Sequence, residues 1–239
     1  MITVEKIRQL ALIKQTTELN IRREYVQHLF LSYFYQQPET NEVFFKGGTA
    51  LRIVYNSPRF SEDLDFSATL YNIEPLEKAV LNTLDNIEKE GLKTEIGESK
   101  KTTGGYLAII IFNLGDEKVS IQLEVSLRQG DKTGEVVTIA NDFVPAYPIT
   151  VLKREQLIGE KIQALLTRQK PRDFYDLYFI IRANLLMQEE KHILKQTLEV
   201  LRSAKIKFEI ELKQFLPKNQ WAIIKDFKDN LERELERYS

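Results

Sequence analysis

Residues 46–67 read KGGTALRIVYNSPRFSEDLDFS, and no other stretch of the chain is as informative. A Gly-Gly-Thr turn opens a short apolar helix, and after a loop a strand carries Asp63 and Asp65. Side chains two residues apart on a strand share one face, so we expect both carboxylates on one side, with backbones about 7 Å apart. Two like charges at this distance repel unless a cation lies between them. The pattern therefore predicts a divalent metal with oxygen ligands, Mg²⁺ or Mn²⁺.

The Gly-Gly-Thr turn predicts a phosphate-binding site. Gly47 and Gly48 let a ligand approach the backbone closely, and the amides at the start of the following helix suit an anion. Thr49 belongs to the same turn, and an alternative role for it is the N-cap of this helix. Lys46, Arg52 and Arg59 surround the turn in sequence, and we interpret them as auxiliary cations for a triphosphate. An anion site beside metal-holding carboxylates is what a nucleoside triphosphate requires.

Glu124 is the candidate for a third carboxylate. In the segment KVSIQLEVSLR, residues 118–128, apolar and polar side chains alternate, so Glu124 faces away from the core. By itself this pattern indicates a solvated residue. If the strand lies beside 62–67, Glu124 joins the two aspartates, and three carboxylates could hold two Mg²⁺ ions.

Composition excludes several classes of protein. The chain has 239 residues, 43% of them hydrophobic, which is enough to bury a core. The net charge of −1 provides no global basic field, so any contact with nucleic acid must be local. The absence of cysteine excludes disulfides and thiolate metal sites. Since no apolar run approaches the roughly 20 residues of a membrane span and no signal peptide is recognisable, we expect a cytoplasmic protein without membrane association.

Periodicity and turn residues predict an α+β chain in two parts. Helices are expected at 3–13, 17–36 and 73–90, with one or two helical turns at 49–56. Strands are expected at 43–46, 62–67, 92–98, 105–114, 118–128 and 135–140. From about 153 onward the chain is expected to be helical, with breaks near 169–172, 203–205 and 217. The predicted domains are thus 1–150 and 151–239, and a cleft between two such halves is a common ligand site.

The helical half carries two further candidates. Lys161 lies in an apolar stripe, four residues from both Leu157 and Leu165, and a lysine there must be paired or must reach solvent or a phosphate. Asp173 and Asp176 follow Pro171 and are expected as the N-cap and the capping-box acid of a helix. Asp176 could equally orient a substrate or fix Lys161. A basic cluster could bind an RNA backbone or simply be a solvated helix end; it comprises Lys153, Arg154, Arg168, Lys170 and Arg172.

These motifs resemble the AbiEii/AbiGii toxin family of DNA polymerase β-like nucleotidyltransferases. The resemblance is carried by FKGGTALR at 45–52, SPRFSEDLDF at 57–66, EKIQALLTR at 160–168 and PRDFYDL at 171–177. It implies a palm with a mixed, mostly antiparallel sheet, an N-terminal helical segment and a helical C-terminal domain. It also implies transfer of NMP from an NTP, typically onto RNA and in some relatives onto the 3′ acceptor end of tRNA. An antitoxin encoded nearby and a role in growth arrest or abortive infection are implied as well.

The same resemblance assigns roles to the candidate residues. Gly47, Gly48 and Thr49 match the phosphate-binding turn, Asp63 and Asp65 the metal pair, and Lys161 the lysine expected on the triphosphate. Asp176 matches the last motif, and Glu124 stands where the third carboxylate of the superfamily falls. Two other functions stay open: transfer onto a small molecule or a protein hydroxyl, and a nucleotide-binding module without turnover that acts through a partner.

Overall fold

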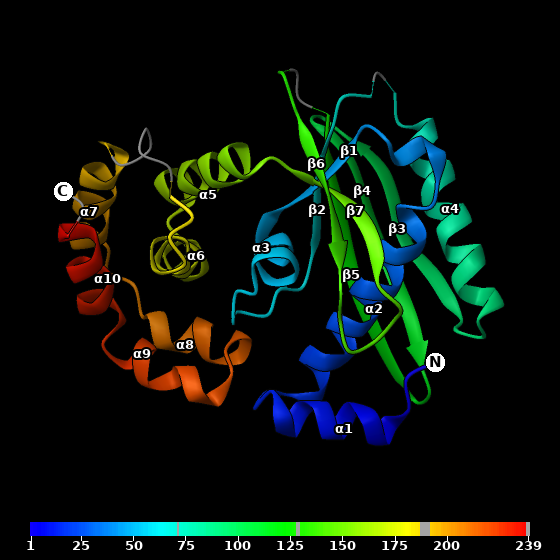
Figure 1. Ribbon diagram of the computed structural model, residues 1–239, viewed down its shortest axis with the longest axis horizontal. Coiled ribbons are helices and arrows are strands. Elements are labelled where there is room, and N and C mark those ends of the chain that lie inside the picture. The colour runs from blue at the N-terminus through cyan, green and yellow to red at the C-terminus, as the bar shows by residue number, and fades with distance from the viewer. Residues whose placement is uncertain (71, 128–129, 187–191, 238–239) are drawn as a thin grey trace. The chain divides into compact units, whose positions relative to one another are not determined.

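The computed structural model describes residues 1–70, 72–127, 130–186 and 192–237, and the chain divides into two compact units (Figure 1). The first unit, called the sheet unit below, comprises residues 1–56 and 60–152. The second, called the helical unit, comprises residues 57–59 and 153–239. The short segment 57–59 therefore groups with helices that follow it by about a hundred residues in sequence.

The sheet unit is built on a seven-stranded sheet in the described part of the chain. The strand order is β3-β4-β5-β2-β1-β7-β6. Strands β2 and β5 are parallel, as are β1 and β7, and the other pairings are antiparallel, so the expected mixed, mostly antiparallel sheet is confirmed. The strands are β1 (Val43–Lys46), β2 (Leu64–Ala68), β3 (Thr94–Thr102), β4 (Gly105–Leu114), β5 (Glu117–Ser126), β6 (Gly134–Ile139) and β7 (Tyr147–Leu152).

Strand β7 was not predicted, because Pro145 and Pro148 make its sequence resemble a linker. The parallel ladder from β1 pairs Phe45 with Val151, three residues beyond Pro148, so the proline lies outside that ladder. On the other side β7 pairs with β6. Strand β5 matches the predicted strand 118–128 closely. The last residue of that prediction, 128, lies outside the described residues.

Four helices belong to the sheet unit: α1 (Val4–Ile13), α2 (Glu18–Phe34), α3 (Gly47–Tyr55) and α4 (Glu74–Lys89). Helix α2 packs on β5 and β7, and α4 packs on α2 and β3 (Figure 1). The face that α2 covers holds the core. The centre of the Phe66 ring lies 5.3 Å from the centre of the Phe34 ring and 5.4 Å from that of the Phe45 ring. Since side chains alternate along a strand, the residues between these point to the opposite face.

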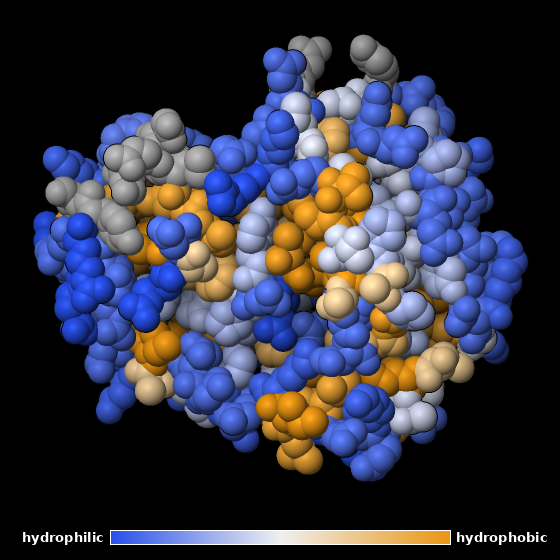
Figure 2. All heavy atoms as spheres, in the orientation of Figure 1, coloured by the Kyte–Doolittle hydropathy of each residue, from blue (hydrophilic) through white to orange (hydrophobic). Residues whose placement is uncertain are grey.

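Helix α1 closes the lower edge of the core and leaves one apolar side uncovered. Ile7, Leu10 and Ala11 are buried against Ile21 and Phe60. Leu12 and Ile13, at the end of the helix, are largely exposed, and Figure 2 shows hydrophobic surface over this part of the molecule. Helix α1 thus contributes to the core through one face only.

The helical unit contains the helices α5 (Arg154–Arg168), α6 (Pro171–Arg182), α7 (Leu194–Ser203), α8 (Phe208–Leu212), α9 (Trp221–Lys225) and α10 (Phe227–Glu236). The expected breaks near 169–172, 203–205 and 217 are confirmed. The core of the helical unit is aromatic. The centre of the Phe208 ring lies 5.4 Å from that of Phe174 and 5.0 Å from that of Phe227, and Tyr175 stacks on Phe227. Helices α8 and α10, which lie beyond the motifs recognised in the sequence, therefore complete the core around α6. Within the described ranges, none of the helices has the length and apolar character that crossing a bilayer requires.

Candidate active site

Three of the predicted site residues form one row across neighbouring strands. In the register of the sheet, Asp65 of β2 stands opposite Lys46 of β1 on one side and Glu124 of β5 on the other. Directly opposed residues project from the same face, which here is the one opposite the Phe45 and Phe66 core. The condition under which Glu124 would join the aspartate strand is therefore met, because β5 lies beside β2.

Gly47 lies directly against the Asp65 carboxylate. It begins α3 with φ +83°, a conformation that favours glycine, and a Cβ built on it would stand 2.0 Å from Asp65 Oδ2. The turn expected to bind phosphate and one of the expected metal ligands are thus in contact. A phosphate at the first amides of α3 would place two anions together, and such a pair requires a cation.

Asp63 and Thr49 are joined through the backbone. Asp63 immediately precedes β2, and its carbonyl oxygen accepts a hydrogen bond from Thr49 Oγ1. The N-cap of α3 is Lys46, without a side-chain hydrogen bond, so the N-cap role considered for Thr49 is wrong. The reason is that the helix starts two residues earlier than expected, which makes Thr49 its third residue. Its buried hydroxyl instead ties α3 to the segment that carries Asp63.

The residues around Asp65 fit a divalent cation that is completed by substrate. Among the described residues, no three His, Cys, Asp or Glu side chains come together in a group able to hold a metal ion. The expected three-carboxylate cluster is therefore not assembled by the protein alone. Mg²⁺ commonly takes one or two carboxylates and fills its octahedral shell with water and substrate phosphates, and Asp65 with its neighbour Glu124 suits that demand.

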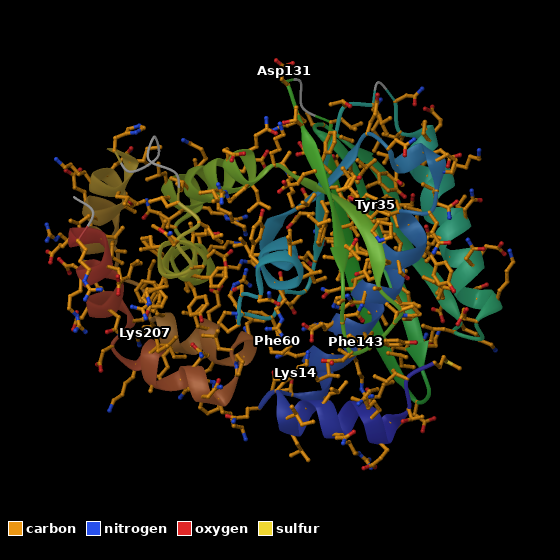
Figure 3. The ribbon with its side chains drawn as sticks, viewed as in Figure 1. Lys14, Tyr35, Phe60, Asp131, Phe143 and Lys207 are labelled. Atoms are coloured by element: carbon orange, nitrogen blue, oxygen red, sulfur yellow. The ribbon has the colours of Figure 1, made fainter. Side chains whose placement is uncertain are left out.

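Arg52 is engaged inside the sheet unit. Its Nε lies 2.7 Å from Glu24 Oε1 on α2, and its guanidinium lies 3.9 Å from the centre of the Phe60 ring. Glu24 is buried, and burial alone would raise its pKa, but the charges of Arg52 and Lys14 outweigh this effect and lower the pKa. These three residues line a polar cavity of about 250 Å³ beside Phe143; Lys14 and Phe143 are labelled in Figure 3. The structure thus gives Arg52 an ion-pair partner, and its contact with a nucleotide stays a prediction.

The predicted residues of the helical unit form a buried triad with a residue from the segment 57–59. Lys161 Nζ on α5 lies 2.7 Å from Asp176 Oδ2 on α6, so the expectation that Asp176 fixes Lys161 is confirmed. Arg59 contacts the same carboxylate, with Nε 2.7 Å from Oδ1 and Nη2 3.0 Å from Oδ2. Burial would raise the pKa of Asp176, but the two cations outweigh it and hold the pKa at about 2. Sequence reasoning interpreted Arg59 as a nucleotide contact and did not predict this partner.

Asp173 is not the N-cap of α6. The N-cap is Lys170, whose backbone N–H donates to Asp173 Oδ2 at 3.1 Å. Pro171 takes the first helical position, where its missing N–H costs nothing, so the helix starts three residues earlier than an N-cap at Asp173 would place it. Asp173 also accepts from Arg168 Nη2 at 2.6 Å, so one member of the basic cluster is neutralised.

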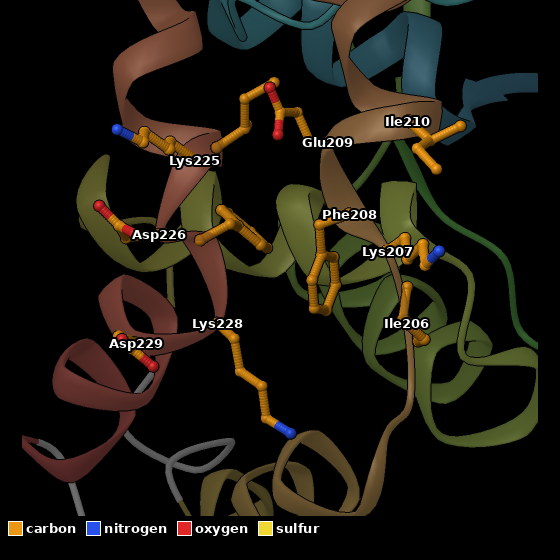
Figure 4. Close-up of a pocket in the computed structure, with 11 residues that line it drawn as sticks. Ile206, Lys207, Phe208, Glu209, Ile210, Lys225, Asp226, Lys228 and Asp229 are labelled. Carbon is orange, nitrogen blue, oxygen red and sulfur yellow. The ribbon is translucent and has the colours of Figure 1, made fainter.

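A second cavity, within the helical unit, contains none of the predicted site residues. It measures about 470 Å³ and is lined by residues 206–210 and 224–229 (Figure 4). Phe208 and Phe227 form its apolar wall. The Lys228 ammonium donates hydrogen bonds to the carbonyl oxygens of Arg202 and Ala204.

Comparison with solved structures finds the same fold in other proteins. The nucleotidyltransferase toxin MenT4 of Mycobacterium tuberculosis superposes with a TM-score of 0.65 at 18% identity, over 100% of this chain and 90% of that one. JHP933 of Helicobacter pylori superposes with a TM-score of 0.66 at 22% identity, over 93% of each chain. No curated protein matches the chain.

The chain, with its glycine turn seated on an aspartate strand of a mixed sheet, shares its fold with the nucleotidyltransferase toxin MenT4. The family of nucleotidyl transferase AbiEii toxins, from type IV toxin–antitoxin systems, matches residues 29–237. The chain belongs to this family. It is a nucleotidyltransferase toxin that uses an NTP and is paired with an antitoxin.

Proposed function

We propose that this toxin transfers a nucleotide from an NTP to the 3′ hydroxyl of an RNA, with tRNA as the acceptor, in a reaction that depends on a divalent metal. The observation that carries the proposal is the contact between Gly47 and Asp65. It brings together an anion-binding helix start and a carboxylate in a row with Glu124 and Lys46. The choice of tRNA follows from the family resemblance. Because NTPs and tRNA share the cytoplasm, the reaction is proposed to occur there.

Positioning and charge neutralisation account for most of the proposed catalysis. The first amides of α3, at Gly47–Thr49, hold phosphate oxygens, and Lys46 supplies a nearby positive charge. The acceptor oxygen attacks the α-phosphorus in line, and a bond from that oxygen to phosphorus forms. The bond between the α-phosphorus and the oxygen that bridges it to the β-phosphorus breaks, pyrophosphate leaves with that oxygen, and the hydroxyl proton passes to solvent water. Little covalent chemistry is required of the protein.

Asp63, Asp65 and Glu124 are the residues proposed to hold the metal, together with phosphate oxygens of the substrate. When bound, Mg²⁺ or Mn²⁺ would neutralise phosphate charge and lower the pKa of the attacking hydroxyl. From the helical unit, Lys161 is proposed to bind an anionic group of the nucleotide, and Asp176 to hold its ammonium in place. Arg52 is a weaker candidate, because its guanidinium already pairs with Glu24.

The test is transfer of each of four α-labelled NTPs to purified tRNA, with Mg²⁺, with Mn²⁺ and with a chelator. We expect metal-dependent labelling of the RNA by the wild-type protein. We expect Asp65→Asn to reduce labelling by at least about a hundredfold, as loss of one charged group at a reacting centre does. Asp85→Asn is the matched control, because Asp85 lies exposed on α4 and pairs with Lys89. Unchanged transfer by Asp65→Asn would refute the site.

The same assay separates the competing functions when protein extract and small hydroxyl compounds are supplied in place of tRNA. Label on a protein or a small molecule, with none on RNA, would replace the proposed acceptor and keep the chemistry. Tight NTP binding without any labelled product would indicate a binding module. Labelling that persists in the chelator would contradict metal dependence.

A further inference from the structure

Arg59 is placed in the helical unit by a short excursion of the chain. Helix α3 ends at Asn56, which adopts a left-handed conformation with φ 60°. Ser57–Arg59 then belong to the helical unit, while Phe60 belongs again to the sheet unit and is buried there.

The three charged groups form a compact chain of contacts. Arg59 is 3% exposed and Asp176 1% exposed, so both are removed from water. Asp176 Oδ1 accepts a hydrogen bond from Arg59 Nε, and Asp176 Oδ2 accepts one from Arg59 Nη2 and one from Lys161 Nζ. The two-pronged Arg59 contact fixes the plane of the carboxylate, and the carboxylate in turn fixes the Lys161 ammonium.

The charges in this cluster do not cancel. Asp176 carries one negative charge and is shared between two cations, so the triad keeps a net positive charge. Paired with Asp176 alone, Lys161 would be fully neutralised and would attract an anion less. Lys161 is the member with the most exposed side chain, at 11%, and so it is the one that a ligand can reach.

We propose that Arg59 is a positioning residue of the transfer reaction: through Asp176 it fixes the direction of the Lys161 ammonium and preserves its charge for the phosphates of the NTP. This inference rests on the proposed function, because it presumes that Lys161 meets the nucleotide. It differs from a direct role of Arg59 on the nucleotide, which its burial against Asp176 argues against. Arg59 accordingly affects catalysis only while Asp176 is ionised and in place.

The experiment is a double-mutant cycle on Arg59→Gln and Asp176→Asn, read by steady-state kinetics and by calorimetric binding of a non-hydrolysable ATP analogue with Mg²⁺. We expect Arg59→Gln to raise KM for the NTP, and to weaken binding of the analogue, by about tenfold or more, since bonds to charged groups have that magnitude. We expect the double variant to be no worse than Asp176→Asn alone. Arg59→Lys should recover part of the affinity, because it restores the charge without the two-pronged geometry.

Matched controls separate positioning from folding. Arg182→Gln removes another ion pair of α6, an exposed one with Glu234, and should leave KM and binding unchanged. Circular dichroism and thermal unfolding identify variants that have lost the fold. If Arg59→Gln unfolds, the comparison of Arg59→Lys with wild type still tests the proposal, since loss of the planar fork alone should raise KM.

The outcomes distinguish this inference from the proposed function. Transfer that is sensitive to Asp65→Asn but unaffected by Arg59→Gln would overturn the inference and leave the function standing. If the effects of Arg59→Gln and Asp176→Asn on KM and on analogue binding are additive in free energy, the inference is overturned as well, because Arg59 would then act independently of Asp176. A wild-type protein that neither binds nor transfers a nucleotide would overturn both.

Discussion

At the scale of a single residue, Gly47 connects the proposed anion site to the proposed metal site. The space between its α-carbon and Asp65 holds a hydrogen atom but no Cβ. The same residue has a positive φ, so both the backbone and the space around it favour glycine. A substitution there should affect chemistry and stability together.

We predict that Gly47→Ala destabilises the protein by about 1–3 kcal/mol through backbone strain, with a further cost from displacing Asp65. Transfer activity should be lost because the carboxylate leaves its place. Urea unfolding and the labelling assay measure the two effects. Gly115→Ala is the matched control, since Gly115 also has a positive φ but nothing lies within 4 Å of its added Cβ. Equal effects of the two substitutions on activity would contradict the prediction.

At the scale of secondary-structure elements, a buried hydrogen bond joins helix α2 to strand β7. His28 Nδ1 on α2 lies 2.8 Å from the Tyr147 hydroxyl on β7. Burial lowers the pKa of His28 to about 4, so the imidazole is neutral in the folded protein at neutral pH. The packed state therefore excludes a proton that the unfolded chain binds more readily.

This pKa shift predicts a pH dependence of stability. Unfolded histidine titrates near 6.5, so between pH 6.5 and 4 the unfolded state binds the additional proton and the free energy of unfolding falls as pH falls. The full effect is on the order of 3 kcal/mol. Denaturant unfolding from pH 7 to 4 measures it, and His28→Gln should show a smaller slope than wild type. His192→Gln, at an exposed histidine, should keep the wild-type slope; equal slopes for both variants would exclude His28 as the cause.

At the scale of the whole molecule, positive and negative charges are nearly equal in number. The chain has 34 basic and 35 acidic residues, and several arginines of the helical unit are paired with carboxylates. A protein of this kind attracts a polyanion through a few local contacts and not through a broad field.

We therefore predict a shallow salt dependence for the proposed RNA acceptor. The logarithm of the apparent affinity for tRNA should fall with the logarithm of salt concentration with a slope no steeper than about −3, which corresponds to few phosphate contacts. Titration of tRNA at several salt concentrations measures the slope. A slope of about −6 or steeper would reveal an extended basic surface, which the balanced charge does not predict.

Much of the fold follows from local sequence. The helices α1, α2 and α4 and the strands β1, β4 and β5 lie close to their predicted positions, because each has a strong apolar period and clear turn residues at its ends. Strand β7 was missed because its prolines resemble those of a linker. The starts of α3 and α6 were placed two or more residues late, since Gly47 and Pro171 belong to the helices and do not precede them.

The chemical groups of the proposed site follow from local patterns in the sequence: a glycine turn suited to an anion, and carboxylates spaced two residues apart. The tertiary structure alone decided which distant groups meet them. Glu124 joins Asp65 only through the pairing of β5 with β2, and Arg59 reaches Asp176 across 117 positions. The reason is physical: a local pattern limits the backbone of a few residues, whereas a buried ion pair or a strand pairing depends on how the whole chain packs.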